Sequence, residues 1–199
     1  MNFYGTFVFL SFVILIVIVV RSINSLLRKG ITPGAKKKKK VSTLLLYPLF
    51  LILFFTWIFE LIRIAFQFPD IVLPQQISMP VYQSIVLKIA GIIVIILALY
   101  LLKIALAHFG SSLRFGLDKK NHGKLVTKGI FSVSRNPFFL SLDLYFFGTA
   151  LILPTIFIIV FSIVAIVSIH FFILKEEKFM RNVYGSEYEE YRKKVKRYI

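Results

Sequence analysis

Long runs of apolar residues, separated by short polar segments, constrain the fold of this 199-residue chain more than any other feature. A helix needs roughly 20 apolar residues to cross the hydrocarbon core of a bilayer, which is about 30 Å thick. Four runs reach or approach that length: Phe3–Val20, Thr43–Phe66, Ser84–Ala107 and Thr155–Leu174. Hydrophobic residues make up 58% of the chain, whereas about 45–50% is usual for a soluble domain. The sequence therefore predicts an all-α integral membrane protein.

A fifth apolar run, Phe138–Leu153, is shorter and lies between Pro137 and Pro154. Proline removes a backbone donor and disfavours helix in the residue before it, so Pro154 is expected to separate this run from the last one. One helix from Phe138 to Leu174 would be about 55 Å long, which is too long for a single crossing. We therefore expect five transmembrane helices, of which the last two form a tight hairpin.

The distribution of the basic residues predicts how these helices cross the membrane. The chain carries a formal net charge of +16. Lys and Arg gather after the first and third runs and in the tail after Leu174, whereas Gln67–Tyr82 contains none. Because cytoplasmic segments are enriched in Lys and Arg, this pattern places the N-terminus outside and a helical C-terminal tail in the cytoplasm. A bacterial cytoplasmic membrane would suit such a chain, with the run Lys36–Lys40 facing anionic membrane lipids.

The same features disfavour other classes of protein. A nucleic-acid-binding protein usually carries its basic residues on one face of a soluble domain. Here they lie in short segments between apolar runs, so we expect no nucleic-acid partner. The chain has no cysteine, which excludes disulfides, thiolate metal ligands and cysteine nucleophiles. His170 has no second His or Cys nearby, so we expect no metal site.

A few ionisable residues lie inside or beside the apolar runs. Such groups are costly in a membrane helix and usually face the protein interior or the interface. Glu60 and Arg63 are three residues apart, so they can pair on one helix face. Asp143 lies within the fifth run and needs a partner if it is buried. His170 and Glu177 are seven residues apart and therefore share one helix face.

Two polar clusters carry the strongest functional signal. The first is GKLVTKGIFSVSRNPFFLS, Gly123–Ser141. Pro137 suits the first helical position and Asn136 suits the N-cap, so this helix entrance, with its free backbone donors, predicts an anion site. The second cluster begins with the paired Glu176 and Glu177. Because the predicted hairpin brings both clusters to one end of the bundle, we expect them to lie close together.

These clusters resemble a known family. LVTKGIFSVSRNPFF, followed after about forty residues by EEKFMRNVYGSEYEEYRKKVKRYI, is similar to the isoprenylcysteine carboxyl methyltransferase family. That family belongs to a wider group of membrane methyltransferases that includes the phospholipid N-methyltransferases. The resemblance covers about the last eighty residues, and five crossings also fit bacterial relatives. The residues that carry it are Gly129, Phe131, Arg135, Pro137, Glu176, Glu177, Tyr184, Gly185, Tyr188, Tyr191, Val195 and Arg197.

The resemblance implies S-adenosylmethionine as the cofactor, and a membrane-embedded lipid or lipidated acceptor, of which a carboxylate is one form. The cofactor's carboxylate suits an arginine or the helix entrance, its ammonium and ribose hydroxyls suit carboxylates, and its adenine suits an aromatic slot. We expect a single domain over 1–199, with helices one to three in 1–109 and the cofactor-binding half in 110–199. The expected cofactor-binding residues are Phe131, Arg135, Asn136, Pro137, Phe138, Glu176, Glu177 and Tyr188.

The acceptor decides which catalytic groups are needed. A carboxylate acceptor requires no general base, so positioning and a dry pocket would suffice. An amine must lose a proton, and Glu177, Asp143 and His170 are the candidates to take it. Arg197 and Arg181 are candidates to hold an anionic acceptor.

The chain also departs from the family pattern. Asn136 stands where the family usually has a histidine, and an amide can hydrogen-bond but cannot carry charge. Phe139, Ser141 and Phe179 replace a tyrosine, a glycine and a leucine. A non-catalytic membrane protein that kept the scaffold is therefore one alternative. A nicotinamide-dependent membrane reductase, usually a longer chain, is another. A transporter is the least favoured alternative, because the charged clusters lie at one face and transporter sites lie near the midplane.

Overall fold

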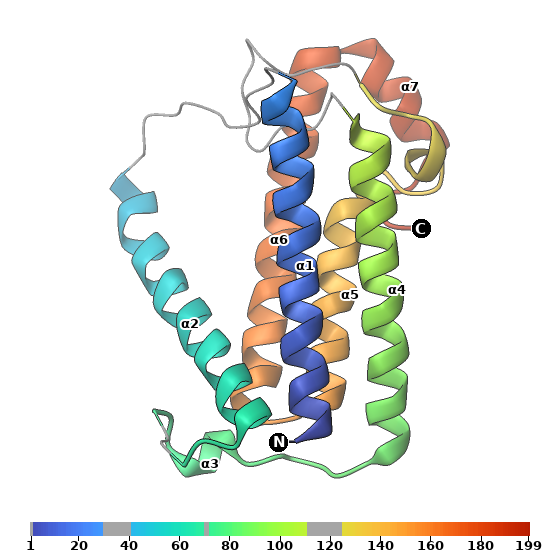
Figure 1. The fold of residues 1–199 in the computed structure, drawn as a ribbon. Coiled ribbons are helices and arrows are strands. Elements are labelled where there is room, and N and C mark those ends of the chain that lie inside the picture. Colours follow the sequence, from blue (N-terminus) through green and yellow to red (C-terminus); the bar gives the residue numbers. More distant parts are fainter. Residues whose placement is uncertain (1, 30–40, 70–71, 111–124) are drawn as a thin grey trace.

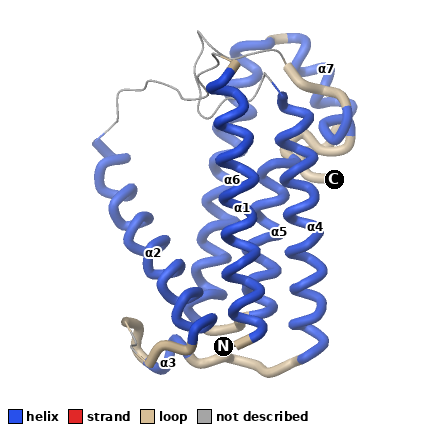
Figure 2. Tube along the Cα trace, viewed as in Figure 1, coloured by secondary structure: helices blue, strands red, loops and turns tan. Residues whose placement is uncertain are grey.

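The computed structural model describes residues 2–29, 41–69, 72–110 and 125–199, and Figures 1 and 2 show helices joined by loops. The lysine run Lys36–Lys40 and the start of the cluster Gly123–Ser141 lie outside these residues. The described elements are α1 (Phe3–Arg28), α2 (Val41–Phe66), α3 (Gln75–Ser78), α4 (Ile85–Phe109), the 3₁₀ helix η2 (Gly129–Ser132), α5 (Pro137–Ile152), α6 (Ile156–Tyr184) and α7 (Ser186–Lys194).

Four of the described helices are long and apolar enough to cross a membrane, namely α1, the part Pro48–Phe66 of α2, α4 and α6. The chain is therefore a multi-pass membrane protein. Helix α5 is also apolar but has 16 residues, which extend about 24 Å, so the fifth crossing stays a prediction. In Figure 1, α1, α4, α5 and α6 run side by side, and α2 is inclined to them.

An aromatic core joins the long helices. Trp57 of α2 is fully buried and stacks on Phe161 of α6, with ring centroids 5.4 Å apart. The ring of Phe12 in α1 meets Trp57 edge-on at 5.0 Å. The hydroxyl of Tyr145 in α5 donates to the Val8 carbonyl of α1 at 3.2 Å. Packing and interhelical hydrogen bonds of this kind drive helix association in membranes, so four helices share one core.

Helices α4 and α5 approach each other closely at two glycines. A Cβ atom on Gly91 would lie 2.6 Å from Cγ1 of Ile152 and 2.8 Å from the carbonyl oxygen of Gly148. A Cβ atom on Gly148 would lie 2.8 Å from Cγ1 of Ile95. Neither position has room for a side chain, so the two glycines permit the close backbone contact that small residues provide in membrane helix pairs.

The predicted hairpin is confirmed, since α5 and α6 pack against each other and only Leu153–Thr155 joins them. Helix α6 continues to Tyr184, well past the end of the apolar run at Leu174. The residues after that run are mostly good helix formers. Gly185, with a φ of 55°, then ends the helix in a conformation that favours glycine. The twin glutamates therefore lie on a continuous helix.

Two elements differ from the prediction. Helix α1 continues to Arg28, beyond the predicted end of the run at Val20, because a membrane helix need not stop where its sequence becomes polar. The short helix α3 lies in a segment predicted only as a loop. An isolated antiparallel bridge between Pro80 and Thr155 ties the segment after α3 to the turn of the hairpin.

Candidate functional site

The two sequence clusters meet at the end of α6, where Glu177 lies between two arginines. Nη2 of Arg135 donates to Oε1 of Glu177 at 2.8 Å, and its Nε donates to the same oxygen at 3.3 Å. Nη2 of Arg197 donates to Oε2 at 2.9 Å, and its Nε donates to Oε1 at 3.2 Å. We call these three residues the arginine–glutamate clamp. The side chains of Arg135 and Glu177 are 8% and 5% exposed, so the clamp is a buried ion pair with a second cation, and the predicted proximity is confirmed.

Arg135 also ties the C-terminal tail to the start of α5. Its Nη1 donates to the carbonyls of Arg192 at 3.0 Å and Val195 at 2.7 Å, and its backbone N–H donates to the Lys196 carbonyl at 3.0 Å. The planar fork of a guanidinium suits such multiple bonding. Arg197 is more open, with 33% of its side chain exposed. Among the described residues its Nη1 donates no hydrogen bond, so Arg197 is the clamp residue with capacity for a ligand.

Asn136 behaves differently from the prediction. It occupies the N-cap position of α5 and Pro137 is the first helical residue, as expected, but the Asn136 side chain makes no capping bond. Its Nδ2 instead donates to the Arg197 carbonyl at 3.2 Å. The hydroxyl of Ser134 donates to the same carbonyl at 3.3 Å. The amide is turned away from the helix because the tail carbonyl offers a competing acceptor, so Asn136 fastens the tail beside the clamp.

Aromatic residues support the clamp from the side of η2 and α7. The hydroxyl of Tyr191 donates to the Phe131 carbonyl at 2.6 Å, and the Phe131 ring meets Phe109 of α4 with centroids 4.5 Å apart. Tyr188 is 2% exposed and packs with Tyr191 and Val195. Burial raises the pKa of Tyr188 to about 12, so its phenol stays neutral at physiological pH and leaves the charge balance of the clamp unchanged.

Two carboxylates present buried oxygens that accept no hydrogen bond from the described residues. They are Oε2 of Glu176 and Oδ1 of Asp143. Buried polar atoms in proteins almost always have a partner, so each of these oxygens is a place where a donor from a ligand or from water would bind. Asp143 lies on α5, about two turns after Asn136. Burial, and then the charge of Asp143, raises the pKa of Tyr198.

Tyr198 is a site residue that the sequence did not single out. Its hydroxyl lies 2.7 Å from Nδ1 of His170, and the two rings stack with centroids 6.2 Å apart. The sequence signal that could have identified Tyr198 was the spacing of His170 and Glu177 on one helix face. Arg197 binds Glu177. The next tail residue, Tyr198, contacts His170, which lies two turns before Glu177 on α6. His170 and Tyr198 therefore form a second polar pair next to the clamp.

Two other predicted site residues have different surroundings. Arg181 pairs with Glu189 of α7 at 3.2 Å, and both side chains are more than 40% exposed. Phe138 packs against the buried group of Leu26, Leu102 and Leu106. The structure thus brings Arg135, Asn136 and Glu177 together with Arg197 and does not bring Arg181 into the clamp. The roles of all these residues in binding or catalysis stay predictions.

Comparison with known proteins bears on this arrangement. The family model of the phospholipid methyltransferases matches residues 85–187, which is more than half of the chain. The match runs from the first residue of α4 into α7 and contains both Arg135 and Glu177. No curated protein matches the chain significantly. The predicted membrane methyltransferase group is confirmed, whereas the finer likeness to the isoprenylcysteine branch stays a prediction. The chain belongs to the phospholipid methyltransferase family, whose members are S-adenosylmethionine-dependent methyltransferases.

Proposed function

We propose that this protein methylates the headgroup of a membrane lipid at the end of the bundle that carries the arginine–glutamate clamp. The clamp is the observation that carries the proposal, because it draws the family-matched segment and the C-terminal tail together around one buried carboxylate. A buried ionic network contributes little stability compared with apolar packing. Such a network beside unpaired carboxylate oxygens is a candidate for a functional site.

The residues at this end fit S-adenosylmethionine, which supplies an electrophilic methyl group on a positively charged sulfur when it is bound. Oε2 of Glu176, which has no hydrogen-bond partner among the described residues, can accept a hydrogen bond from an ammonium group or a ribose hydroxyl. The exposed edge of Arg197 can hold a carboxylate or a phosphate through charge-assisted hydrogen bonds. Arg135 contributes indirectly, because its donors are used to hold Glu177 and the tail carbonyls in place.

Asp143, on α5 about two turns after Asn136, favours an amine as the methyl acceptor. An amine headgroup is protonated near neutral pH and must lose a proton before it can attack. Oδ1 of Asp143 has no hydrogen-bond partner among the described residues and can take that proton. A carboxylate acceptor needs no general base, so Asp143 would have no role in its methylation. We therefore infer a lipid that carries an amine beside its phosphate, with Arg197 as the partner of the phosphate.

The first experiment tests the cofactor. The protein is purified in detergent, and S-adenosylmethionine and reduced nicotinamide adenine dinucleotide phosphate are titrated separately by calorimetry. Binding of S-adenosylmethionine and not of the nicotinamide cofactor is expected. No binding of S-adenosylmethionine would contradict the proposal, and tight binding of the nicotinamide cofactor would favour the reductase.

The second experiment tests the acceptor. The protein is incubated with S-adenosylmethionine labelled in its methyl group and with vesicles of phosphatidylethanolamine, of phosphatidylglycerol, or of phosphatidylglycerol with a fatty acid. Label is expected in a lipid only when phosphatidylethanolamine is present. Label in the fatty acid would move the assignment to a carboxylate acceptor. Cofactor binding without transfer to any lipid would favour a chain that kept the scaffold and lost this activity.

A further inference from the structure

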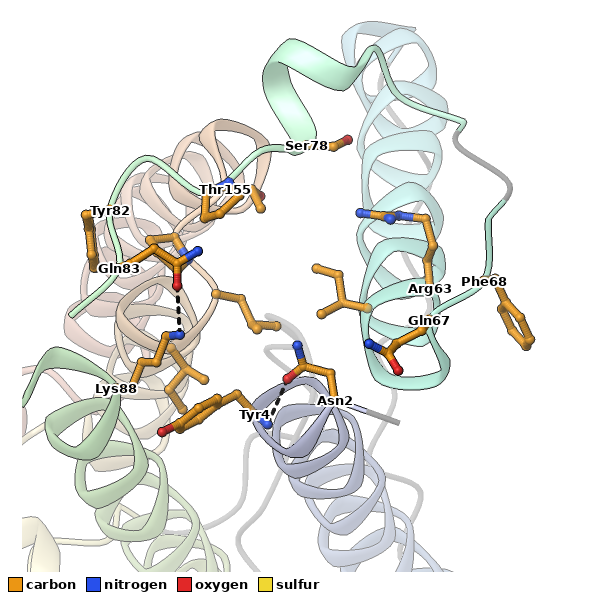
Figure 3. A pocket seen from close by; sticks show the side chains of 15 residues that line it. Asn2, Tyr4, Arg63, Gln67, Phe68, Ser78, Tyr82, Gln83, Lys88 and Thr155 are labelled. Carbon is orange, nitrogen blue, oxygen red and sulfur yellow. Dashed lines mark hydrogen bonds between the residues drawn. The ribbon is translucent and has the colours of Figure 1, made fainter. Parts of the chain in front are cut away.

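A cavity lies at the end of the bundle opposite to the clamp. Its volume is about 400 Å³, within the range of about 300–1,000 Å³ that is typical of small-molecule sites. Its walls come from the start of α1, the end of α2, the segment around the end of α3, the start of α4 and the turn between α5 and α6 (Figure 3). The two sequence clusters do not account for this cavity, since its polar residues are outside both of them.

Lys88 brings a positive charge to the cavity, and no acidic residue in the described part of the chain pairs with it. Arg63 donates from Nε and Nη2 to the two oxygens of the buried Glu60 at 2.8 and 2.6 Å, so that pair is neutral overall. Lys88 has no acidic partner among the described residues. Its Nζ lies 3.4 Å from Oε1 of Gln83 and 4.7 Å from the ring centroid of Tyr4. The ammonium group therefore has further N–H donors for a ligand.

The polar groups at the cavity present donors. Oδ1 of Asn2 accepts the N–H groups of Tyr4 at 3.0 Å and Gly5 at 3.2 Å, which leaves its Nδ2 directed into the cavity in Figure 3. Nη1 of Arg63 donates no bond to any described residue. The Ser78 hydroxyl is buried and has no partner in the described part of the chain. Donors around a cation accommodate an anionic group rich in acceptors.

The remaining wall is apolar and lies at a membrane surface. Ile64, Ile152 and Leu153 line the cavity beside the polar groups. The cavity sits where α1 and α4 begin and α2 ends, which is the level of lipid headgroups for three candidate spans. A site with donors on one side and aliphatic residues on the other suits an amphiphile. We propose that this cavity binds the phosphate group of a phospholipid from the leaflet opposite to the clamp. The inference does not depend on the methyl-transfer proposal.

The absence of cysteine allows a local readout. Phe68 lines the cavity and is 48% exposed, so Phe68→Cys provides the single attachment point for an environment-sensitive fluorophore. The labelled protein in detergent is titrated with three probes: dihexanoylphosphatidylglycerol, dihexanoylglycerol, which has no phosphate, and inorganic phosphate. A saturable fluorescence change with the first probe alone is expected. Because the fluorophore is at this end, lipid binding near the clamp does not contribute to the signal.

Three variants, made in the fluorophore-labelled Phe68→Cys protein, test how Lys88 and Asn2 contribute to binding, and a fourth is the control. Lys88→Gln removes the charge, and Asn2→Asp keeps a capping oxygen for α1 while it replaces the amide donors with a carboxylate. Each is expected to weaken binding of dihexanoylphosphatidylglycerol about tenfold or more, since a charge-assisted hydrogen bond is lost. Lys88→Arg keeps the charge and should bind within about threefold of the parent protein. Lys103→Gln is the matched control, because Lys103 lies on the same helix near its other end and should leave the affinity unchanged.

Each outcome decides the assignment. Weaker binding in Lys88→Gln and Asn2→Asp, with retained binding in Lys88→Arg and Lys103→Gln, supports the lipid phosphate site. An equal response to inorganic phosphate would show a site for free anions, and an equal response to dihexanoylglycerol would show an apolar groove. Both results overturn the proposal, as does equal affinity in all four variants. A melting temperature for each variant establishes that the comparison is made between folded proteins.

Discussion

At the scale of single residues, the two neighbouring glutamates have different surroundings. Glu177 has both oxygens bound by arginines, whereas Oε2 of Glu176 is buried and unpaired within the described chain. Successive residues on a helix point about 100° apart, so Glu177 faces the arginines that hold the tail, whereas Glu176, for which we propose a role in ligand binding, does not. The sequence motif treats the two residues alike, and the structure separates them.

Arg135→Ala should destabilise the protein rather than only weaken cofactor binding. The change removes the bonds to Glu177 and to the carbonyls of Arg192 and Val195, at a cost of about 3 kcal/mol, because a buried charge loses one of its partners. Thermal unfolding in detergent measures the loss. Arg181→Ala is the control, since its exposed pair with Glu189 is worth less than about 1 kcal/mol. Equal melting temperatures for the two variants would contradict the anchoring role.

Asn136→His should preserve the structure and cofactor affinity, because an imidazole N–H can replace Nδ2 as the donor to the Arg197 carbonyl. Asn136→Leu removes the donor and leaves that carbonyl with fewer partners, which should cost about 1–3 kcal/mol. Thermal unfolding and calorimetric titration of S-adenosylmethionine check both variants. A loss in the histidine variant as large as that in the leucine variant would show that the bond to Arg197 is not what Asn136 provides.

Asp143→Asn should slow methylation of an amine lipid by about 10²-fold or more, the usual contribution of a general base. Affinity for S-adenosylmethionine should stay unchanged, since Asp143 is assigned to the acceptor side. Transfer rates and calorimetry on the same preparation separate the two effects. Ser141→Ala on the same helix is the control, because that hydroxyl bonds only the Phe138 carbonyl within the described residues. An unchanged rate in Asp143→Asn would remove the base from the proposal.

At the scale of helices, the α4–α5 contact positions the clamp. Helix α5 begins directly after Arg135 and Asn136, so any outward movement of α5 would move these residues away from the end of α6. The facing glycines Gly91 and Gly148 keep α5 close to α4. Small residues far from the charged groups thus determine where the charged groups meet.

Gly91→Val should force α4 and α5 apart, because even a Cβ atom there would lie 2.6 Å from Ile152 and 2.8 Å from the Gly148 carbonyl. Overpacking of this kind typically costs about 1–3 kcal/mol, and cofactor affinity should fall with it. Ala107→Val on the exposed part of α4 should change stability by less than about 0.5 kcal/mol. Melting temperatures that do not distinguish the two variants would show that the contact is looser than the structure indicates.

At the scale of the whole molecule, the bundle has two chemically different ends. In Figure 1, α7 and the C-terminus lie toward one end and α3 lies at the other. The first end carries the clamp and the basic tail, and the second carries the cavity with Lys88. Basic residues at the first end favour a cytoplasmic position. A methyl donor made in the cytoplasm would then reach the clamp directly, and the cavity would face the opposite leaflet.

Single cysteines test this arrangement, since the natural chain has none. Arg28→Cys and Lys193→Cys should react with a membrane-impermeant maleimide only when the cytoplasmic face is accessible. Met79 directly follows α3, and α3 lies at the other end of the bundle in Figure 1. Met79→Cys should therefore react only from the opposite side. Labelling intact cells and inverted vesicles makes the comparison. Reaction of all three cysteines from one side would contradict a crossing by α2, and reaction of Arg28→Cys and Lys193→Cys from opposite sides would contradict five crossings.

The sequence alone determined the long apolar helices and the approach of Arg135 to the end of α6. In lipid, backbone groups must be satisfied within a helix, so the length of each apolar run is enough to predict an element, and Pro154 is enough to place the hairpin. The proximity of Arg135 to Glu177 followed from that connectivity. Only the tertiary structure decided which donor meets which acceptor. The Asn136 side chain bonds the Arg197 carbonyl instead of capping α5, and the Tyr198 hydroxyl contacts His170. The ends of several helices enclose the cavity beside Lys88. These choices depend on ångström-scale distances between segments far apart in the chain, and no local pattern of residues encodes such distances.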